Sequence, residues 1–463
     1  MTDSSTLDVI NPSTGETIAS INTDSKESAL LKLDRAWQLH KDSTRHLPLH
    51  TRISLLEKLA AHLVSRREDF ISTMVKEGGK PWRDSQVEFD RAVHGIQLAI
   101  STVAKHTGSS IPLGYQLSSA NRMANTQVFP IGVVLAFSAF NHPLNLIIHQ
   151  IIPAFATGCP CLVKPASDTP MSCKLLVESM HEVGIPLDYI QAVVPANLDI
   201  AGELVTSEKI AFFSFIGSAR VGWMLRSQLK PGVRCALEHG GIAPAIVSQN
   251  ADLDSAVTAI AKGGFYHAGQ VCVSTQRIYV HASVLDTFIT KLKEKAATLK
   301  VGDALEPETD VGPLIRSSEV TRIHSWVQEA INEGAECVLG GEVIDEHYYQ
   351  PTILVNPATD AKVSNQEIFG PVVCLYSYDT LDEAIAACNH EKFAFQASIF
   401  SENLGEVTQA YNGIEASAVM VNDHTAFRDD VMPFAGLKHS GLGVGGIPYT
   451  IHDMQYEKML VLK

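Results

Sequence analysis

Short apolar runs alternate with amphipathic stretches along most of the chain. Residues 34–80 have the apolar spacing of helices, with several helix-ending signals. From Pro130 onward, buried-strand runs and helical stretches take turns. The predicted strands are 131–138, 161–167, 188–194 and 210–217, and the predicted helices are 143–158, 171–184, 201–207 and 218–229. A second series begins near Ala243, with strands at 243–248 and 277–280 around a helix at 253–269.

This alternation predicts an α/β fold with two doubly wound lobes, each built on a mainly parallel sheet. Loops at the carboxyl ends of the strands of both lobes should meet, and the chemistry is expected there. The closing segment, 458–463, has the pattern of an edge strand. Because an unpaired edge strand is a liability, we expect it to pair with another subunit.

Composition narrows the class of protein. A chain of 463 residues is too long for one ordinary hydrophobic core, so we expect two or three lobes. The net charge of -15 argues against a nucleic-acid or membrane-surface partner. The most apolar stretch, 144–156, is too short and too interrupted to span a bilayer. The N-terminus lacks an apolar signal-peptide core, and the eight cysteines are scattered without metal-ligand spacing. We therefore expect a cytoplasmic protein with reduced thiols and no metal site.

Cys272 differs from the other cysteines because it lies in a glycine-bearing turn between a helix and a β-branched run. Glu238 ends a predicted strand just before Gly240 and Gly241. A carboxylate in such an apolar, flexible setting can have a raised pKa and act as a general base. The alternative is a structural carboxylate that accepts backbone N–H bonds.

Two motifs are typical of cofactor binding. In "SFIGSARVGWML" a strand ends at Ile216, Gly217 turns the chain, and a helix follows, whose N-terminus favours phosphate. Lys164 ends another strand and would donate to ribose hydroxyls or a phosphate. An ordinary tight turn and a solvated lysine are the respective alternatives. "GLGVGG" at 441–446 matches a nucleotide-loop pattern but follows no clear strand, so we do not assign it that role.

The segments "AFNHP", "LVKPAS", "FSFIGSARVG", "LEHGG", "AGQVCVSTQR", "VGPLI", "QEIFGPVV" and "MPFAGLKHSGLG" occur in the order and spacing of one family. Over essentially its whole length the chain resembles the aldehyde dehydrogenase superfamily. The resemblance implies NAD(P)-dependent oxidation of an aldehyde to a carboxylic acid, and a homodimer or homotetramer. It also implies a division into a cofactor-binding domain, a catalytic domain, and a small β oligomerisation arm with the C-terminal segment. The corresponding ranges are 1–111 with 131–239, then 240–442, and lastly 112–130 with 443–463.

The resemblance also assigns roles in catalysis. Cys272 would attack the aldehyde to form a thiohemiacetal, whose oxyanion would be stabilised by the side-chain amide of Asn141 and the N–H of Cys272. After hydride transfer, Glu238 would activate the water that hydrolyses the thioester. The implied cofactor-binding set is Lys164, Ser167, Gly217, Ser218, Gly222, Gly240, Glu367 and Phe369.

Departures from the family pattern bear on the cofactor and the base. Many NAD-using members carry a glutamate where Ser167 stands, and a serine can hydrogen-bond a 2′-phosphate that a carboxylate would repel. We therefore expect NADP to be accepted as well as NAD, although Asp168 next door weakens the argument. His239 replaces a common leucine; it would either lower the pKa of Glu238 or face away from it.

The substrate pocket is assigned by analogy to Asn145, His149, Val271, Val273, His424, Phe427, Arg428 and Phe434. His149 occupies the place of a basic residue in semialdehyde-oxidising members. Together with Arg428 it indicates a small polar or anionic aldehyde. The alternative, which we slightly favour, is that Arg428 pairs with Asp429 or Asp430 at the surface.

Three other functions compete with aldehyde oxidation to an acid. Some relatives pass the acyl group to coenzyme A, but these often lack the glutamate base that Glu238 provides. A catalytically retired relative, kept as a binding or structural protein, would have lost Cys272, Glu238 or Asn141. A cysteine hydrolase would use His267, but no third partner can be assigned and the cofactor motifs would be idle.

Overall fold

The computed structural model describes residues 5–105 and 108–463. Its first lobe is built on a six-stranded sheet in the order β19-β9-β8-β5-β6-β7. The parallel strands are β5 (Val133–Phe137), β6 (Cys161–Lys164), β7 (Ile190–Ala192), β8 (Ile210–Ile216) and β9 (Arg234–Glu238), and β19 (Gly441–Leu442) runs antiparallel to β9.

Helices cover both faces of this sheet. One apolar core lies under α2 (Leu49–Ser65), α3 (Arg67–Gly78), α4 (Trp82–Val103), α5 (Asn145–Thr157), α6 (Pro170–Glu182) and α15 (Ile447–Asp453). The other lies under α1 (Lys26–Lys41), α7 (Leu198–Val205) and α8 (Ala219–Arg226). The helix α5 is buried along almost its whole length, which explains its nearly all-apolar sequence.

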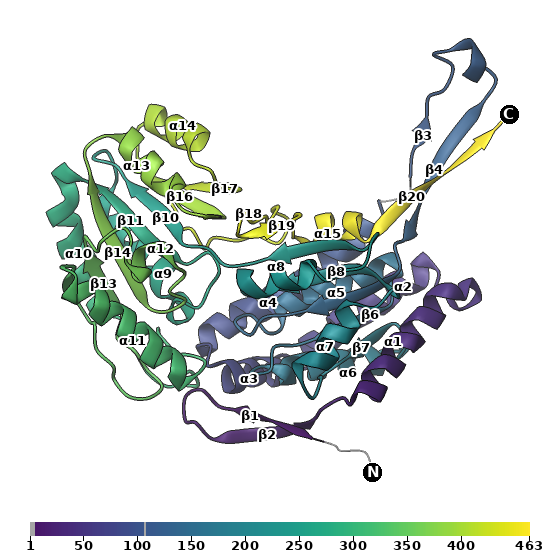
Figure 1. Cartoon of the computed structure of the whole chain (residues 1–463), viewed down its shortest axis with the longest axis horizontal. Coiled ribbons are helices and arrows are strands. Elements are labelled where there is room, and N and C mark those ends of the chain that lie inside the picture. The colour runs from purple at the N-terminus through teal and green to yellow at the C-terminus, as the bar shows by residue number, and fades with distance from the viewer. Residues whose placement is uncertain (1–4, 106–107) are drawn as a thin grey trace.

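The second lobe has a seven-stranded sheet in the order β12-β13-β14-β11-β10-β16-β17. Its strands are β10 (Ala243–Val247), β11 (Thr275–His281), β12 (Glu336–Leu339), β13 (Thr352–Val355), β14 (Val372–Tyr378), β16 (Gln396–Phe400) and β17 (Ala418–Val421). Its helices are α9 (Leu253–Phe265), α10 (Leu285–Ala297), α11 (Ser317–Asn332), α12 (Lys362–Asn365), α13 (Leu381–Asn389) and α14 (Leu404–Gly413), and they too pack on both faces. The two lobes face each other in Figure 1.

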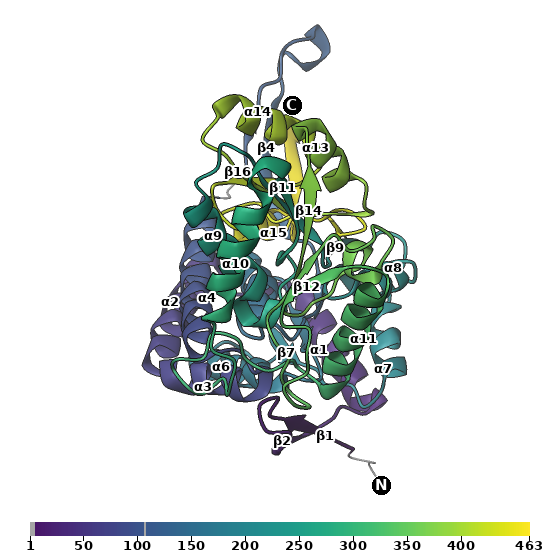
Figure 2. The ribbon, with the colours of Figure 1, turned by 90° about the vertical axis from the view of Figure 1, so that its left-hand side faces the viewer.

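A third, narrow sheet projects beyond both lobes (Figures 1 and 2). It contains β3 (Ser110–Ile111), β4 (Met123–Pro130) and β20 (Gln455–Leu462). The predicted terminal strand therefore begins three residues earlier than expected and pairs antiparallel with β4 along its full length. Because β20 lies at the sheet's edge, its outer side is left unpaired within the chain.

Short elements complete the fold. They are the hairpin of β1 (Thr6–Ile10) and β2 (Thr17–Asn22), the pair β15 (Phe393–Ala394) and β18 (Leu437–Lys438), and the 3-10 turns η1 (Ser43–Arg45), η2 (Leu117–Ser119), η3 (Tyr266–Gly269) and η4 (Ala282–Val284). Across the residues that the structure describes, no helix has the length and apolar character needed to cross a bilayer.

The expected fold, two doubly wound α/β lobes with a small β arm, is confirmed. The proposed division into domains stays a prediction. The structure adds that β19 joins the sheet of the first lobe, and that Ile447 and Ile451 lie in that lobe's core. Residues 441–451 are thus tied to the first lobe by pairing and packing.

Candidate active site

The loop before Cys272 has an unusual backbone. His267 and Ala268 both have left-handed φ angles, 48° and 53°, and Gly269 follows at 70°. A Cβ at Gly269 would lie 2.1 Å from the carbonyl oxygen of Gly370, so only glycine fits there. Strained residues of this kind persist where the surroundings hold them, and they cluster at functional sites. The loop therefore presents Cys272 from a fixed position between η3 and β11.

Asn141 lies directly beside this loop. Its side chain is buried, and Nδ2 donates to the carbonyl oxygen of Gln270 at 2.9 Å. Gln270 is itself held in place, because its Oε1 accepts from the N–H of Ile315 at 2.9 Å and its Nε2 donates to the carbonyl oxygen of Pro313 at 3.2 Å. The Asn141 amide thus contacts Gln270, which precedes the candidate nucleophile Cys272 by two residues and is itself held by two hydrogen bonds.

Cys272 as a residue is partly buried, and the surroundings of its thiol disfavour the thiolate. Burial raises the pKa of Cys272 well above its ordinary value, and the carboxylates of Glu238 and Glu367 raise it further, whereas Arg428 opposes them. The resting thiol is therefore protonated, and attack on a carbonyl carbon requires a base to take its proton.

Glu238 ends β9, as predicted. Its Oε1 is buried and has no hydrogen-bond partner among the described residues, so the picture of a structural carboxylate satisfied by backbone N–H groups is not supported. Burial raises the pKa of Glu238 to about 7, although Arg428 and Arg91 act in the opposite direction. A carboxylate with a pKa near 7 suits general-base work at neutral pH.

His239 faces away from Glu238. Its Nδ1 lies 3.0 Å from the carbonyl oxygen of Gly217, and its ring packs edge-on against Phe215 and Trp223. Burial lowers the pKa of His239, so the ring is neutral and does not act on Glu238 as a cation. Of the two alternatives for His239, the structure supports the second.

The turn after β8 forms one wall of the predicted cofactor crevice. Its backbone is tied to β9 by a hydrogen bond from the N–H of Gly217 to the carbonyl of Glu238, at 3.0 Å. The helix α8 starts after Ser218, and a Cβ at Gly222 would lie only 1.9 Å from Cε1 of His239. The glycine at 222 is thus required for close packing of α8 against His239.

A second part of the predicted cofactor site is the carboxyl end of β6, in the same sheet as β8. Lys164 is partly buried, which lowers the pKa of its ammonium group, and its one hydrogen-bond acceptor among the described residues is the carbonyl oxygen of Pro165, 3.2 Å from Nζ. Ser167 is exposed in the following loop. Its neighbour Asp168 is engaged by the guanidinium of Arg316, with Nε–Oδ1 at 2.6 Å. Lys164 and Ser167 therefore keep hydrogen-bonding capacity that a nucleotide can use.

Glu367 and Phe369 come from the loop before β14. Glu367 Oε1 accepts from the N–H of Gly241 at 3.1 Å, and burial raises the pKa of Glu367 to about 8. A Cβ at Gly240 would lie 1.7 Å from the same oxygen, so glycine is required there. Phe369 has φ 49° and packs edge-on against Phe140, with ring centroids 5.7 Å apart.

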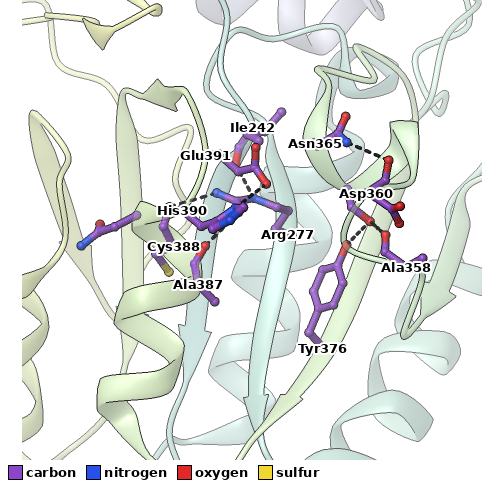
Figure 3. A network of polar contacts seen from close by, with 12 residues as sticks. Ile242, Arg277, Ala358, Asp360, Asn365, Tyr376, Ala387, Cys388, His390 and Glu391 are labelled. Atoms are coloured by element: carbon purple, nitrogen blue, oxygen red, sulfur yellow. Dashed lines mark hydrogen bonds and ion pairs between the residues drawn. The ribbon is translucent and has the colours of Figure 1, made fainter.

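Arg277 fixes the strand that follows Cys272 relative to the glycine segment after Glu238. Figure 3 shows its guanidinium reaching from β11 toward Ile242 and toward the end of α13. Nε donates to the carbonyl oxygen of Ile242 at 3.1 Å, and the Nη atoms donate to those of Ala387 and Cys388 at 3.1 and 3.2 Å. This buried guanidinium ties β11, which follows the nucleophile loop, to Ile242 just before β10.

The substrate side of the site holds a charge network centred on Asp430. Its Oδ1 is 2.6 Å from Nη2 of Arg91 and 2.9 Å from Nε2 of His149. These two partners hold the pKa of Asp430 well below its ordinary value, despite its burial. His149 is thus bound to a carboxylate, and its place in the substrate pocket stays a prediction.

The prediction that Arg428 pairs with Asp429 or Asp430 at the surface is wrong. Asp430 pairs with Arg91 and His149. Its interaction with Arg428 is a longer-range electrostatic attraction without a salt bridge among the described residues. Arg428 is partly buried, donates to the carbonyl oxygen of Met432 at 2.9 Å, and stacks 4.1 Å from the ring of Phe434. Burial lowers the pKa of Arg428 to about 10, and Glu238 and Cys272 act on it electrostatically. Arg428 is therefore a cation of the candidate site itself.

The remaining residues that were assigned to the substrate pocket differ in their burial and contacts. Val271, Val273 and Phe434 share one small apolar cluster with Phe395. Asn145 is buried at the start of α5, and its Oδ1 has no hydrogen-bond partner among the described residues. His424 is buried against Gly263 of α9, and Phe427 is 44% exposed. The roles of these residues stay predictions.

The aldehyde dehydrogenase family model matches residues 1–460. The chain belongs to the aldehyde dehydrogenase family. A 3-sulfolactaldehyde dehydrogenase of Priestia aryabhattai is 38% identical over 458 residues, covering 98% of this chain and 94% of the relative.

Solved structures agree with this membership. Aldehyde dehydrogenase 21 from Physcomitrella patens, in complex with the reaction product succinate, has a TM-score of 0.96 at 32% identity and covers 100% of this chain and 96% of its own. A glyceraldehyde-3-phosphate dehydrogenase from Methanocaldococcus jannaschii, complexed with NADP, has a TM-score of 0.94 at 33% identity and covers 100% of both chains. The expected activity class, an NAD(P)-dependent aldehyde dehydrogenase, is confirmed.

Two residues that support the candidate site of this aldehyde dehydrogenase were not identified from the sequence. Arg91 lies within the regular pattern of α4 and meets Asp430 across 339 positions, so no local signal marks it. Gln276 is buried in β11 and supports the loop that carries Glu367. Its Nε2 donates to the carbonyl oxygen of Gln366 at 2.8 Å and its Oε1 accepts from the N–H of Ile368 at 3.0 Å. A buried glutamine in an apolar strand was the available sequence signal for Gln276.

Proposed function

We propose that this aldehyde dehydrogenase oxidises a small aldehyde that carries an anionic or strongly polar group. One observation carries the proposal: Arg91 and Arg428 both act on Glu238, while Asp430 is the carboxylate that binds Arg91 directly. The site therefore keeps positive charge beside the reacting atoms. The names of the similar proteins, a 3-sulfolactaldehyde dehydrogenase and a succinate-bound enzyme, support an anionic aldehyde.

In the proposed mechanism, Cys272 attacks the carbonyl carbon and its proton passes to a base. Glu238 is the candidate base, because its buried carboxyl has a pKa of about 7. The oxyanion of the tetrahedral adduct accepts hydrogen bonds from Asn141 Nδ2 and from the N–H of Cys272. The nicotinamide of the bound cofactor supplies the acceptor for the hydride. Glu238 next releases the thiol proton to solvent. Its carboxylate then removes a proton from the water that attacks the thioester, the thiolate of Cys272 is expelled and reprotonated, and the acid leaves.

Hydrolysis is preferred over transfer to coenzyme A because Glu238 is present and unpaired at Oε1. The retention of Cys272, Glu238 and Asn141 together argues against a retired relative. Formation of an acyl-coenzyme A product would contradict this part of the proposal.

The residues at the strand ends fit a dinucleotide, because Lys164 ends β6, Ser167 is exposed beyond it, and the N-terminus of α8 follows β8. Lys164, Gly217, Ser218, Glu367 and Phe369 would hold it. We propose that NADP is used as well as NAD, since Ser167 is exposed and the charge of Asp168 is met by Arg316. A kcat/KM for NAD that exceeds that for NADP tenfold or more would contradict this.

We further propose that the protein forms a homodimer or homotetramer through the arm. Met459 and Leu460 of β20 are 55% and 61% exposed beside an unpaired strand edge, which a second copy of the chain would cover. A light-scattering mass equal to that of the monomer would refute it. We also propose a cytoplasmic location, because the eight cysteines are free thiols and the cytoplasm keeps thiols reduced.

The first experiment follows reduced-nicotinamide absorbance with the wild-type protein and the Cys272→Ala variant. NAD and NADP are tested with propanal, glycolaldehyde, succinic semialdehyde and 3-sulfolactaldehyde. We expect turnover that requires Cys272 and is fastest with the anionic aldehydes. Propanal as the best substrate would remove the proposed role of the arginines, and turnover by Cys272→Ala would remove the proposed nucleophile.

A further inference from the structure

Behind the candidate site, Lys80 and Glu88 form an ion pair that is completely buried. Nζ of Lys80 is 2.5 Å from Oε2 of Glu88, and neither side chain is exposed. Replacing a buried ion pair by apolar residues is often neutral or stabilising, because desolvation of the two charges offsets their attraction. The pair is therefore not explained by stability alone. Its position beside the candidate site is the feature that indicates its role.

The second oxygen of Glu88 holds the start of α5. Oε1 accepts from the backbone N–H groups of Leu144 and Asn145, both at 2.9 Å. The first N–H groups of a helix have no partner within the helix, and a carboxylate placed there is favourable. Glu88 thus fixes the segment that directly follows Asn141.

The residue next to the ion pair contacts the segment that supports the nucleophile loop. A Cβ at Gly79 would lie 2.6 Å from Cγ of Pro313, so the backbone of Gly79 packs closely against the Pro313 ring. The carbonyl of Pro313 accepts from Gln270, and the carbonyl of Gln270 accepts from Asn141. Two connections, one through α5 and one through Pro313, therefore meet at the contact between Asn141 and Gln270.

We infer that Glu88, whose buried charge Lys80 compensates, is a positioning residue whose acceptor oxygen sets the place of the Asn141 amide relative to Cys272. The inference rests on the proposed roles of Asn141 and Cys272. Neither Lys80 nor Glu88 is placed in contact with reacting atoms, so neither is a catalytic residue. An oxyanion donor acts only at the correct distance, and a displacement of ~1 Å costs on the order of a hundredfold in rate.

Glu77 provides a matched control. It too is a fully buried carboxylate at a helix start, where it accepts from the N–H groups of Met171 and Ser172 at 2.6 and 2.8 Å. The helix it caps, α6, follows the cofactor crevice and does not carry Asn141. Loss of Glu77 should therefore cost stability like loss of Glu88, without the same effect on the chemistry at saturating cofactor.

The experiment measures the single-turnover rate of reduced-cofactor formation, KM, thermal midpoint and the rate of Cys272 alkylation by iodoacetamide. The variants are Glu88→Ala, Lys80→Met/Glu88→Gln, Glu77→Ala and Asn141→Ala. We expect Glu88→Ala to slow the single turnover ~10- to 100-fold, with aldehyde KM and alkylation rate changed less than about threefold. The double variant keeps an acceptor for α5 without an unpaired buried charge, and should return to within about threefold of the wild type.

Several outcomes would overturn the inference. Equal slowing by Glu88→Ala and Glu77→Ala would show a general loss of structure. If Glu88→Ala does not fold, a double variant that folds but is as slow as Asn141→Ala refutes positioning by the acceptor. A normal rate in Glu88→Ala beside a slow Asn141→Ala refutes the inference alone, whereas a normal rate in Asn141→Ala refutes the proposed oxyanion role.

Discussion

Replacing Glu238 by glutamine tests the proposed hydrolytic step most directly. The substitution keeps the shape of the side chain but removes its basicity. Burial raises the pKa of Glu238 from 4.5 to about 7, which corresponds to ~3 kcal/mol in favour of the neutral form. General-base assistance typically contributes ~10²- to 10⁴-fold, so we expect turnover of Glu238→Gln to fall by that factor.

The wild-type pH profile follows from the same pKa. The carboxylate is the active form, so a raised pKa moves the rise of activity to higher pH. With a pKa of about 7, roughly a tenth of Glu238 is ionised at pH 6 and roughly nine tenths at pH 8. Where thioester hydrolysis limits the rate, kcat should therefore increase about tenfold between these pH values.

Stopped-flow absorbance separates the two chemical steps. The glutamine variant should release one reduced nicotinamide per active site in a first turnover that is itself slowed, because the Cys272 thiol has lost its base. It should then nearly stop, because the thioester is not hydrolysed. Glu238→Asp serves as the control that keeps a carboxylate. Steady turnover of Glu238→Gln within about threefold of the wild type, or a kcat that is already at its plateau at pH 6, would refute the reasoning.

Three further predictions concern the charge network and the cofactor wall. Arg428→Met should raise KM for succinic semialdehyde ~10-fold or more and leave that for propanal nearly unchanged, and equal effects on both would contradict its role. Asp430→Asn should lower the free energy of unfolding by ~3 kcal/mol in urea titration, because Arg91 loses its buried counter-charge; an unchanged midpoint would contradict this. Gly222→Ala should destabilise by ~1–3 kcal/mol and raise the cofactor KM, since its Cβ would lie 1.9 Å from His239. Adding His239→Ala should restore both quantities, and no recovery would mean that the clash lies elsewhere.

The elements that the sequence predicted well are those whose signal is local. The strands β5, β6 and β8 are short apolar runs that end in turn residues, and α5 ends at Gly158, which has the left-handed φ of 91° that favours glycine. Cys272 follows the turn that contains Gly269, whereas the left-handed backbone of His267 and Ala268 in that turn was not predicted. The direction of a side chain was harder to predict where no turn residue or strand end marks the position, as the wrong prediction for Arg428 shows.

Sequence alone determined the α/β class, the two lobes and the identity of the chemical groups, because hydrophobic periodicity and short motifs are properties of neighbouring residues. Tertiary structure decided which charges meet. Arg91 reaches Asp430, and Glu88 caps α5, through contacts between segments far apart in the chain. Burial likewise decided that the pKa of Glu238 is about 7, since desolvation depends on everything packed around the carboxyl and on no single stretch of sequence.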